Sequence, residues 1–228
     1  VMITTGYDCE LILVNDGSID KTWEIISKLA SKEPRILGIN LVRNFGQHNA
    51  LLCGIGFAKF DMCVTLDDDL QYLPEDIPKL IGKLDEGFDV VYGVPIVSCH
   101  GLARNFISFM ARWAGSVIFG IEKARILSAF RAFRTELTSS FDHLQGHFVS
   151  IDSMLSWNTS NFGHIRVRHD WRRVEKSNYN FKKLLILSLT MLFGFNFRKY
   201  IHNSGKTSYV IQQTTGINNY KYDKGGSS

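Results

Sequence analysis

An α/β fold with a mostly parallel, doubly wound sheet is predicted for roughly the first 95 residues of this 228-residue chain. Short apolar runs typical of buried strands alternate with longer segments in which apolar residues recur every three or four positions. Turn-forming Asn, Asp and Gly residues follow several of these runs. Strands that alternate with helices form parallel sheets that carry helices on both faces.

The strands and helices of this region are each bounded by a recognisable signal. The run 62–66 must end where a series of aspartates begins. Asp20 is placed to cap the first helix, and Pro74 precedes the third, where proline is tolerated best. Strands are therefore expected at 10–14, 36–42, 62–66 and 90–92, and helices at 20–29, 47–59 and 77–84.

The alternation loosens beyond residue 95. Residues 101–120 are predicted as an apolar amphipathic helix, and 128–134 as a strand or turn. The apolar stretch 181–197 has an uncharged core too short to span a bilayer, so it is interpreted as a core or interfacial helix. The polar tail after residue 200 is expected to be disordered, although 207–215 has strand-like character.

Charge is distributed unevenly along the chain, whose net charge is +4. Residues 164–199 carry nine Lys and Arg against two acidic residues. A solvated basic face and a site for an anionic partner (phosphate, nucleic acid or an acidic membrane) are both compatible with this segment. The four cysteines are scattered without metal or disulfide spacing, and no signal peptide is visible, which favours a reducing compartment.

Carboxylates and an amide cluster directly after the third predicted strand. If the backbone stays extended there, Asp67, Asp69 and Gln71 project to the same side, because strand side chains alternate. Two carboxylates and an amide oxygen suit a hard cation such as Mg²⁺ or Mn²⁺. Open α/β sheets bind ligands at the carboxyl ends of their strands. A solvated acidic turn is the alternative interpretation.

Five motifs occur in order over roughly residues 5–198. They are Val14-Asn-Asp-Gly-Ser-Ile-Asp20, Arg43-Asn-Phe-Gly46, Leu66-Asp-Asp-Asp-Leu-Gln71, Ser128-Ala-Phe-Arg131 and Arg172-Arg-Val-Glu-Lys-Ser-Asn-Tyr179. Together they resemble inverting family 2 glycosyltransferases of GT-A fold. The chain looks like the branch that acts on polyprenyl phosphates, such as dolichol-phosphate mannose synthases and the bacterial enzymes that load glucose or aminoarabinose onto undecaprenyl phosphate.

The resemblance implies roles for the matching residues. Asp16 would contact the nucleotide base, with an Asx-turn as the alternative. Asp67 would lie nearer the sugar-nucleotide, and Asp69 and Gln71 would reach a Mg²⁺ or Mn²⁺ ion that clamps the diphosphate. Arg131 would lie near the acceptor or donor phosphates. The resemblance thus implies Asp67, Asp69 and Arg131 as the catalytic residues.

Further cations complete the implied substrate site. Arg43 could pair with a diphosphate oxygen, or it could be an ordinary loop arginine. Arg172, Lys176 and Ser177 fit a family element that closes over the active site. Glu175 stands where the family has glycine, so this loop departs from the family pattern.

The reaction implied is transfer of a sugar from a nucleotide diphosphate to a polyprenyl phosphate, with inversion at the anomeric carbon. A phosphate acceptor is already anionic, so no strong base is required. A saccharide hydroxyl acceptor, the first alternative, would need a carboxylate base, for which Asp152 is the spare candidate unless it caps a helix. A second alternative is a catalytically inactive fragment that binds nucleotide or membrane. No nucleic-acid-binding module is recognised.

The resemblance also divides the chain. Residues 1–180 would form the GT-A catalytic domain, without the family's first strand because family members begin with a strand and helix that precede Val1 here. Residues 181–199 would form an amphipathic, membrane-interfacial helix, and 200–228 a disordered tail. We expect a cytoplasmic protein, peripheral at the inner face of the cell membrane, and a homo-oligomer is compatible with the sequence.

Overall fold

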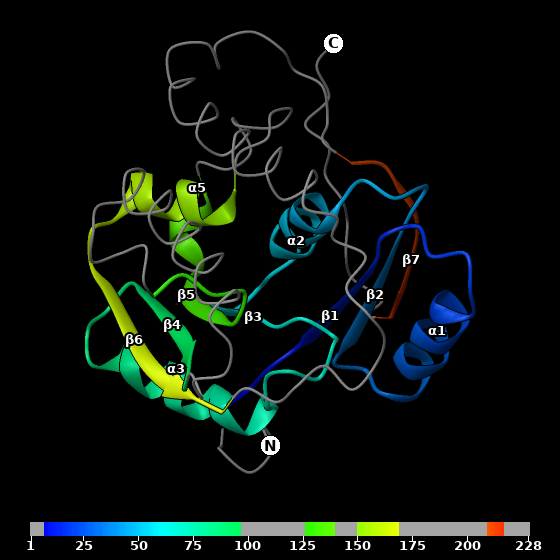
Figure 1. The fold of residues 1–228 in the computed structure, drawn as a ribbon. Coiled ribbons are helices and arrows are strands. Elements are labelled where there is room, and N and C mark those ends of the chain that lie inside the picture. Colours follow the sequence, from blue (N-terminus) through cyan, green and yellow to red (C-terminus); the bar gives the residue numbers. More distant parts are fainter. Residues whose placement is uncertain (1–6, 97–125, 140–149, 169–208, 217–228) are drawn as a thin grey trace, which may run out of the picture. The chain divides into compact units, whose positions relative to one another are not determined.

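The computed structural model describes residues 7–96, 126–139, 150–168 and 209–216, which belong to two compact units. The three-stranded unit contains described residues 7–58 and 209–216, and the four-stranded unit contains those between 59 and 168. Figure 1 labels their elements. The helices are α1 (Thr22–Lys32), α2 (Gln47–Ile55), α3 (Ile77–Asp85) and α5 (Ile151–Asn158), and the strands are β1 (Leu11–Asn15), β2 (Ile36–Leu41), β3 (Met62–Thr65), β4 (Val90–Pro95), β5 (Arg131–Arg134), β6 (Phe162–Val167) and β7 (Ile211–Gly216).

The three-stranded unit has the strand order β1-β2-β7. Strand β1 runs parallel to β2, and helix α1 makes the crossover that parallel neighbours require. Leu37, Ile39 and Leu41 of β2 pack against Ala50 and Cys53 of α2. Gly38, which points to the opposite face, lies against the side chains of α1. The two helices therefore cover opposite faces of this sheet.

The four-stranded unit has the order β3-β5-β4-β6. Strand β5 is antiparallel to both β3 and β4, whereas β4 and β6 are parallel. One face packs Val91 and Ala132 against Leu80 and Leu84 of α3. The other face directs Tyr92 toward α5, to which it is hydrogen-bonded. Strands β3, β4 and β6 thus share one direction, and their carboxyl ends lie at one edge.

The α/β class is confirmed, but the sheets are mixed rather than mostly parallel. The predicted elements up to residue 95 are present, most of them within one to three residues of their predicted ends, and the helix expected at 47–59 stops at Ile55. The antiparallel pairs come from β5 and β7, which lie outside the alternating pattern. Helix α1 begins at Thr22, and Asp20 accepts hydrogen bonds from the Thr22 amide and hydroxyl.

The expectation of a disordered tail is wrong for residues 211–216. They form β7, which pairs antiparallel with β2 from Leu37↔Gly216 to Leu41↔Ile211. An edge strand with unpaired amides is a ready template for such pairing, which a polar segment can satisfy as well as an apolar one. The predicted helices at 101–120 and 181–199 lie outside the described residues. Among the helices that the structure describes, none is both long and apolar enough to cross a membrane.

Candidate functional site

Asp16 follows the last residue of β1 and holds the turn between β2 and α2. Its Oδ1 accepts from the Phe45 amide at 2.7 Å, and its Oδ2 accepts from the Gly46 amide at 2.9 Å. A carboxylate is favoured beside backbone N–H groups that precede a helix. Asp16 is therefore not an Asx-turn residue: it clamps a distant turn, and each oxygen keeps acceptor capacity for a ligand.

Gly17 allows the two turns of this unit to interlock. Its φ is +68°, and a Cβ built on it would lie 2.3 Å from the Arg43 carbonyl carbon and 2.4 Å from the Asn44 nitrogen. No other residue type avoids both the strain and the clash. The Asn15–Ser18 turn and the Arg43–Gly46 turn, which two of the predicted motifs supply, thus form one compact structure.

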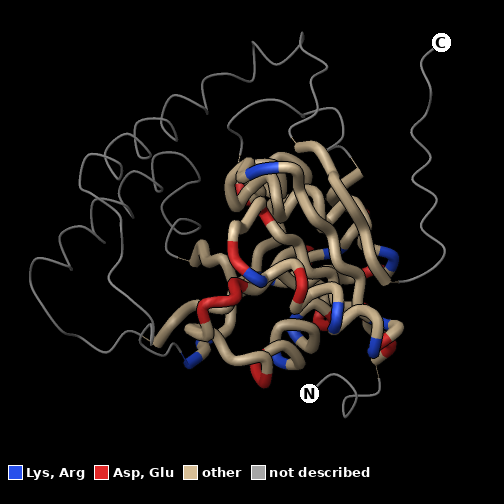
Figure 2. Tube along the Cα trace, turned by 90° about the vertical axis from the view of Figure 1, so that its right-hand side faces the viewer, with Lys and Arg blue, Asp and Glu red and all other residues tan. Residues whose placement is uncertain are grey.

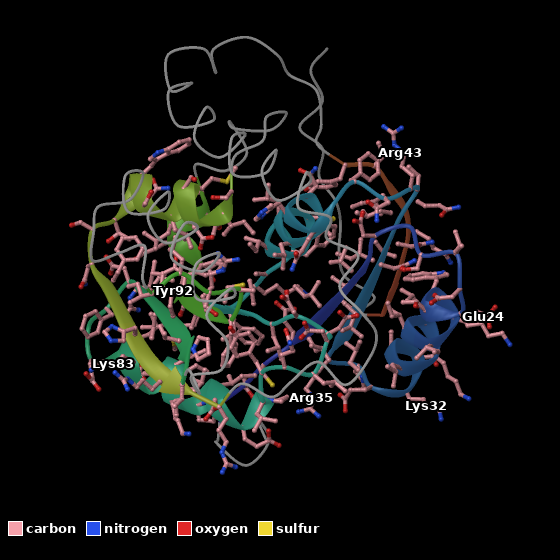
Figure 3. The ribbon with its side chains drawn as sticks, in the orientation of Figure 1. Glu24, Lys32, Arg35, Arg43, Lys83 and Tyr92 are labelled. Carbon is pink, nitrogen blue, oxygen red and sulfur yellow. The ribbon has the colours of Figure 1, made fainter. Side chains whose placement is uncertain are left out.

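Arg43 lies on the outer surface of this interlocked pair of turns. Its guanidinium carbon is 5.0 Å from the centroid of the Phe45 ring, a cation–π contact. The side chain is exposed, and Figure 3 shows it reaching outward from its turn. Among the described residues no acidic partner neutralises it, so its charge is available to an anion.

The Asp67–Gln71 loop does not stay extended, so the side-chain alternation of a strand, which would project Asp67, Asp69 and Gln71 to one side, does not apply to it. The chain turns at Asp68 and Asp69, and Leu70 adopts the left-handed conformation with φ +60°. Asp69 Oδ1 instead accepts from the Gln71 amide at 3.1 Å, which brings these two residues together. Asp68 is exposed, whereas Asp67 and Asp69 are half-buried.

Tyr72 connects this acidic loop to the segment that begins at Ser128. Its hydroxyl accepts from Ser128 Oγ at 3.0 Å, and its ring lies 5.2 Å from the Phe130 ring. Burial raises the pKa of Tyr72, and the negative charges of Asp67 and Asp69 raise it further. Both carboxylates are therefore close enough to this hydroxyl to influence it electrostatically. Two motifs separated by about sixty residues meet here.

Arg131 lies in a row of polar side chains that crosses the four-stranded sheet. It pairs in register with Thr65 of β3 and Tyr92 of β4, so all three project from one face. Its Nε donates to Thr65 Oγ1 at 3.2 Å, and its Nη1 forms an ion pair with Asp152 of α5. The side chain is only 3% exposed. The structure thus places Arg131 inside the unit rather than on an open surface.

Asp152 is the common acceptor of this network. Its Oδ1 accepts from Arg131 and from the Tyr92 hydroxyl, the latter at 2.9 Å (Tyr92 is labelled in Figure 3). The helix-capping interpretation of Asp152 is wrong, because Ser150 is the N-cap of α5 and its Oγ accepts from the Ser153 amide. Asp152 carries the charge that compensates a buried guanidinium.

The network changes the protonation behaviour of its members. Burial and the neighbouring Asp152 charge raise the pKa of Tyr92 well above its ordinary value. Burial acts to lower the pKa of Arg131, but the charges of and hydrogen bonds to Asp152 and Tyr92 together outweigh it, so the net shift is upward. Arg131 is therefore cationic and Tyr92 neutral across the physiological range.

The donor set of the acidic loop fits a divalent ion only in part. Asp69 and Gln71 offer a carboxylate and an amide oxygen, which are the ligand types that Mg²⁺ and Mn²⁺ take. Within the described ranges no group of three or more His, Cys, Asp or Glu side chains is arranged to hold a metal. An ion at this loop would need further oxygens, such as those of a bound diphosphate.

The remaining predicted site residues, Arg172, Lys176 and Ser177, lie outside the described residues. Two residues of the site were not predicted. Tyr72 is half-buried and Tyr92 is buried, and the hydroxyl of each has a hydrogen-bond partner, as tyrosine hydroxyls in such surroundings usually do. A tyrosine in the otherwise aliphatic strand Val90-Val-Tyr92 is the signal that could have identified the second of them.

Comparison with known proteins gives a consistent result. Residues 2–141 match the family profile described as Glycosyl transferase family 2. The undecaprenyl-phosphate 4-deoxy-4-formamido-L-arabinose transferase of Shewanella sediminis is 31% identical over 188 residues, which are 82% of this chain and 57% of that protein. The protein of that name from Pectobacterium carotovorum is 33% identical over 188 residues, with 82% and 58% coverage. The chain thus spans somewhat more than half the length of these relatives.

Solved structures share the fold. Glucosyl-3-phosphoglycerate synthase of Mycobacterium tuberculosis, crystallised with Mn²⁺, UDP-glucose and phosphoglyceric acid, has a TM-score of 0.58 at 19% identity, and the similarity covers 82% of this chain and 69% of that one. Mannosyl-3-phosphoglycerate synthase from Rubrobacter xylanophilus has a TM-score of 0.54 at 13% identity, covering 90% and 79%. At these identities the likeness shows the fold alone, and it confirms the GT-A class.

Proposed function

The chain belongs to glycosyl transferase family 2, and we propose that it takes part in transferring a sugar from a nucleotide diphosphate donor to a polyprenyl phosphate. The observation that carries the proposal is the connection of the Asp67–Gln71 loop to the Ser128–Arg131 segment through Tyr72 and Thr65. It brings a carboxylate pair and a buried arginine into one compact unit at the carboxyl edge of β3.

The donor side of the proposal uses both acidic motifs. Asp69 and Gln71 would hold a Mg²⁺ or Mn²⁺ ion, which would neutralise charge on the leaving diphosphate. Asp67 would lie on the sugar-nucleotide side of the loop. Asp16 would accept a hydrogen bond from the nucleotide base, and Arg43 would pair with a diphosphate oxygen. Support comes from the acceptor capacity left on Asp16 and from the Mn²⁺ and UDP-glucose bound by the Mycobacterium tuberculosis neighbour.

The acceptor side favours a phosphate over a saccharide hydroxyl. A phosphate monoester oxygen is anionic near neutral pH and can attack the anomeric carbon without a strong base, which would invert that centre in one displacement. The spare carboxylate, Asp152, already receives two hydrogen bonds at Oδ1 and balances Arg131. This arrangement suits a structural anion better than a base. The relatives are named as transferases that act on undecaprenyl phosphate, which supports the same acceptor class.

Cations would receive the acceptor phosphate and the membrane around it. Arg131 would act from inside the unit, and Arg172, Lys176 and Ser177 would close over the substrates. The exposed side chains of His164 and Arg166 on β6 alternate with inward-facing ones, and Arg168, directly after the strand, is exposed as well. Elsewhere along the described trace charges of both signs are interspersed (Figure 2). We propose that this basic strand faces the anionic cytoplasmic leaflet of the cell membrane.

Calorimetric titration tests the donor half of the proposal. UDP-sugars and GDP-sugars are titrated into the protein with Mn²⁺ and again with EDTA. We expect metal-dependent binding of one nucleotide, lost in Asp69→Ala and retained in Asp68→Ala, because Asp68 is exposed and adjacent. Absence of binding to folded protein, or equal loss in both variants, would overturn the proposal. Transfer to undecaprenyl phosphate but not to phosphoglyceric acid would then support the acceptor class.

A further inference from the structure

Three side-chain amides form a continuous chain of hydrogen bonds across the three-stranded sheet. Gln212 Oε1 of β7 accepts from Asn40 Nδ2 of β2 at 3.1 Å. Asn40 Oδ1 in turn accepts from Asn15 Nδ2, at the end of β1, at 2.7 Å. Asn15 Oδ1 accepts from the Ser18 backbone amide at 3.3 Å. The tail strand is thereby connected to the turn that contains Asp16.

The donor-to-acceptor direction of this series of hydrogen bonds is fixed at one end by the backbone. The Ser18 amide can only donate, so Asn15 must present its oxygen to Ser18 and its nitrogen to Asn40. Asn40 must then accept with its oxygen, and it offers its nitrogen to Gln212. Because each amide orientation determines the next, residue 212 has to be an acceptor. A donor at this position would oppose the Asn40 nitrogen.

A β-bulge places Gln212 where it can accept. The ladder pairs Leu41 with Ile211 and Asn40 with Gln213, so Gln212 is the extra residue on β7. Bulges redirect a side chain that regular alternation would place elsewhere. Asn15 is 3% exposed, so its side-chain amide depends on protein partners. Gln212 is exposed, and the series of hydrogen-bonded amides ends with it at the surface.

We propose that β7 positions the Asn15–Ser18 turn, with Gln212 as the positioning residue at the end of the amide chain. Gln212 orients Asn40, Asn40 orients Asn15, and Asn15 holds the Ser18 amide. The effect on nucleotide binding rests on the proposed function, because it assumes that Asp16 contacts the base. The effect on the turn does not rest on it.

Hydrogen–deuterium exchange of the full chain tests the positioning role directly. In Gln212→Ala we expect exchange at the Ser18 amide to accelerate about fivefold. This factor corresponds to the net stability that one hydrogen bond contributes to the closed state. Gln212→Glu keeps an acceptor and should retain wild-type protection, whereas Gln212→Lys should lose it. Gln213→Ala is the matched control, since Gln213 is exposed on the same strand and no described residue is bonded to its side chain.

The outcomes separate this proposal from the proposed function. Unchanged Ser18 exchange in Gln212→Ala, equal acceleration in Gln213→Ala, or no difference between Gln212→Glu and Gln212→Lys would overturn the positioning role. Titration of the nucleotide that binds wild type adds a second readout, with weaker binding expected in Gln212→Ala and Gln212→Lys only. If wild type binds no nucleotide, the proposed function fails while the exchange result still decides the role of Gln212.

Discussion

Replacing Asp152 with alanine should be among the most destabilising single changes in the four-stranded unit. Arg131 is 3% exposed, and its ion-pair partner among the described residues is Asp152. Removing that partner leaves a buried guanidinium without compensation, which costs about 3–5 kcal/mol in comparable sites. The Tyr92 hydroxyl loses its acceptor at the same time. We expect the free energy of unfolding to fall by an amount in this range.

Three further variants separate the contributions of the charge and of the hydrogen bonds to this loss in the free energy of unfolding. Asp152→Asn keeps an acceptor but removes the charge, and should cost about 1.5–3 kcal/mol. Tyr92→Phe removes one neutral donor and should cost about 0.5–1.5 kcal/mol. The double variant Arg131→Met with Asp152→Leu removes both charges, and should recover a large part of the stability lost in Asp152→Ala.

Urea unfolding followed by tryptophan fluorescence measures these differences, provided that the slope against urea stays constant across the series. A cost below about 1 kcal/mol for Asp152→Ala would refute the reasoning, because it would mean that water compensates Arg131. A double variant no more stable than Asp152→Ala would refute it independently, since the penalty would then not arise from the unpaired charge. Asp68→Ala, an exposed acidic residue of the same unit, is the control and should lie within about 0.5 kcal/mol of wild type.

Three further predictions concern other sites. Gly17→Ala should cost at least about 1–3 kcal/mol in urea unfolding, because φ is +68° and the new Cβ meets the Arg43 backbone; an unaffected variant would contradict the interlocked turns. Leu70→Asn should stabilise by up to about 1 kcal/mol, since φ is +60° and the leucine is 71% exposed, and a loss of stability would show that Leu70 packs against a partner. Burial raises the pKa of Cys53 to about 12, so the folded protein keeps a proton that the unfolded chain releases near pH 9. Stability should therefore fall between pH 9 and 12 by up to about 1.4 kcal/mol per pH unit more in wild type than in Cys53→Ala.

The sequence predicted the parts of this fold whose signals are local. Alternating apolar runs and periodic segments located the elements from β1 to β4, because each buries its own apolar face. The motifs also identified the two turns and the acidic loop that the structure describes. Strand β7 has a weaker signal: residues 207–215 have strand-like character, but they lie in a polar tail that was expected to be disordered. The segment forms a strand because the edge of β2 offers it a pairing partner.

The site details that could not be predicted depend on contacts between distant residues. Tyr92 and Asp152 are 60 positions apart, and nothing local to either reveals the hydrogen bond between them. The Asp67–Gln71 loop is not extended, because Leu70 takes a left-handed conformation. Leucine rarely adopts this conformation, so the sequence gives no indication of it. Arg131 was predicted from its motif, yet its burial beside Asp152 follows from the register of β5 with its two neighbours.

Each unit, considered by itself, supports an acidic loop in the same way. Asn15 is the last residue of β1 and Thr65 the last of β3, and each is tied across its sheet to a residue paired with it in register. Asn15 bonds to Asn40, and Thr65 bonds to Arg131, so each loop begins from a strand end that cannot turn freely. Asp16 and Asp67 follow within two residues of these anchors. A polar row at the strand ends therefore fixes where the segment that carries each carboxylate begins. Substitutions at Asn40 should therefore disturb the strand end that precedes Asp16, and substitutions at Arg131 the strand end that precedes Asp67.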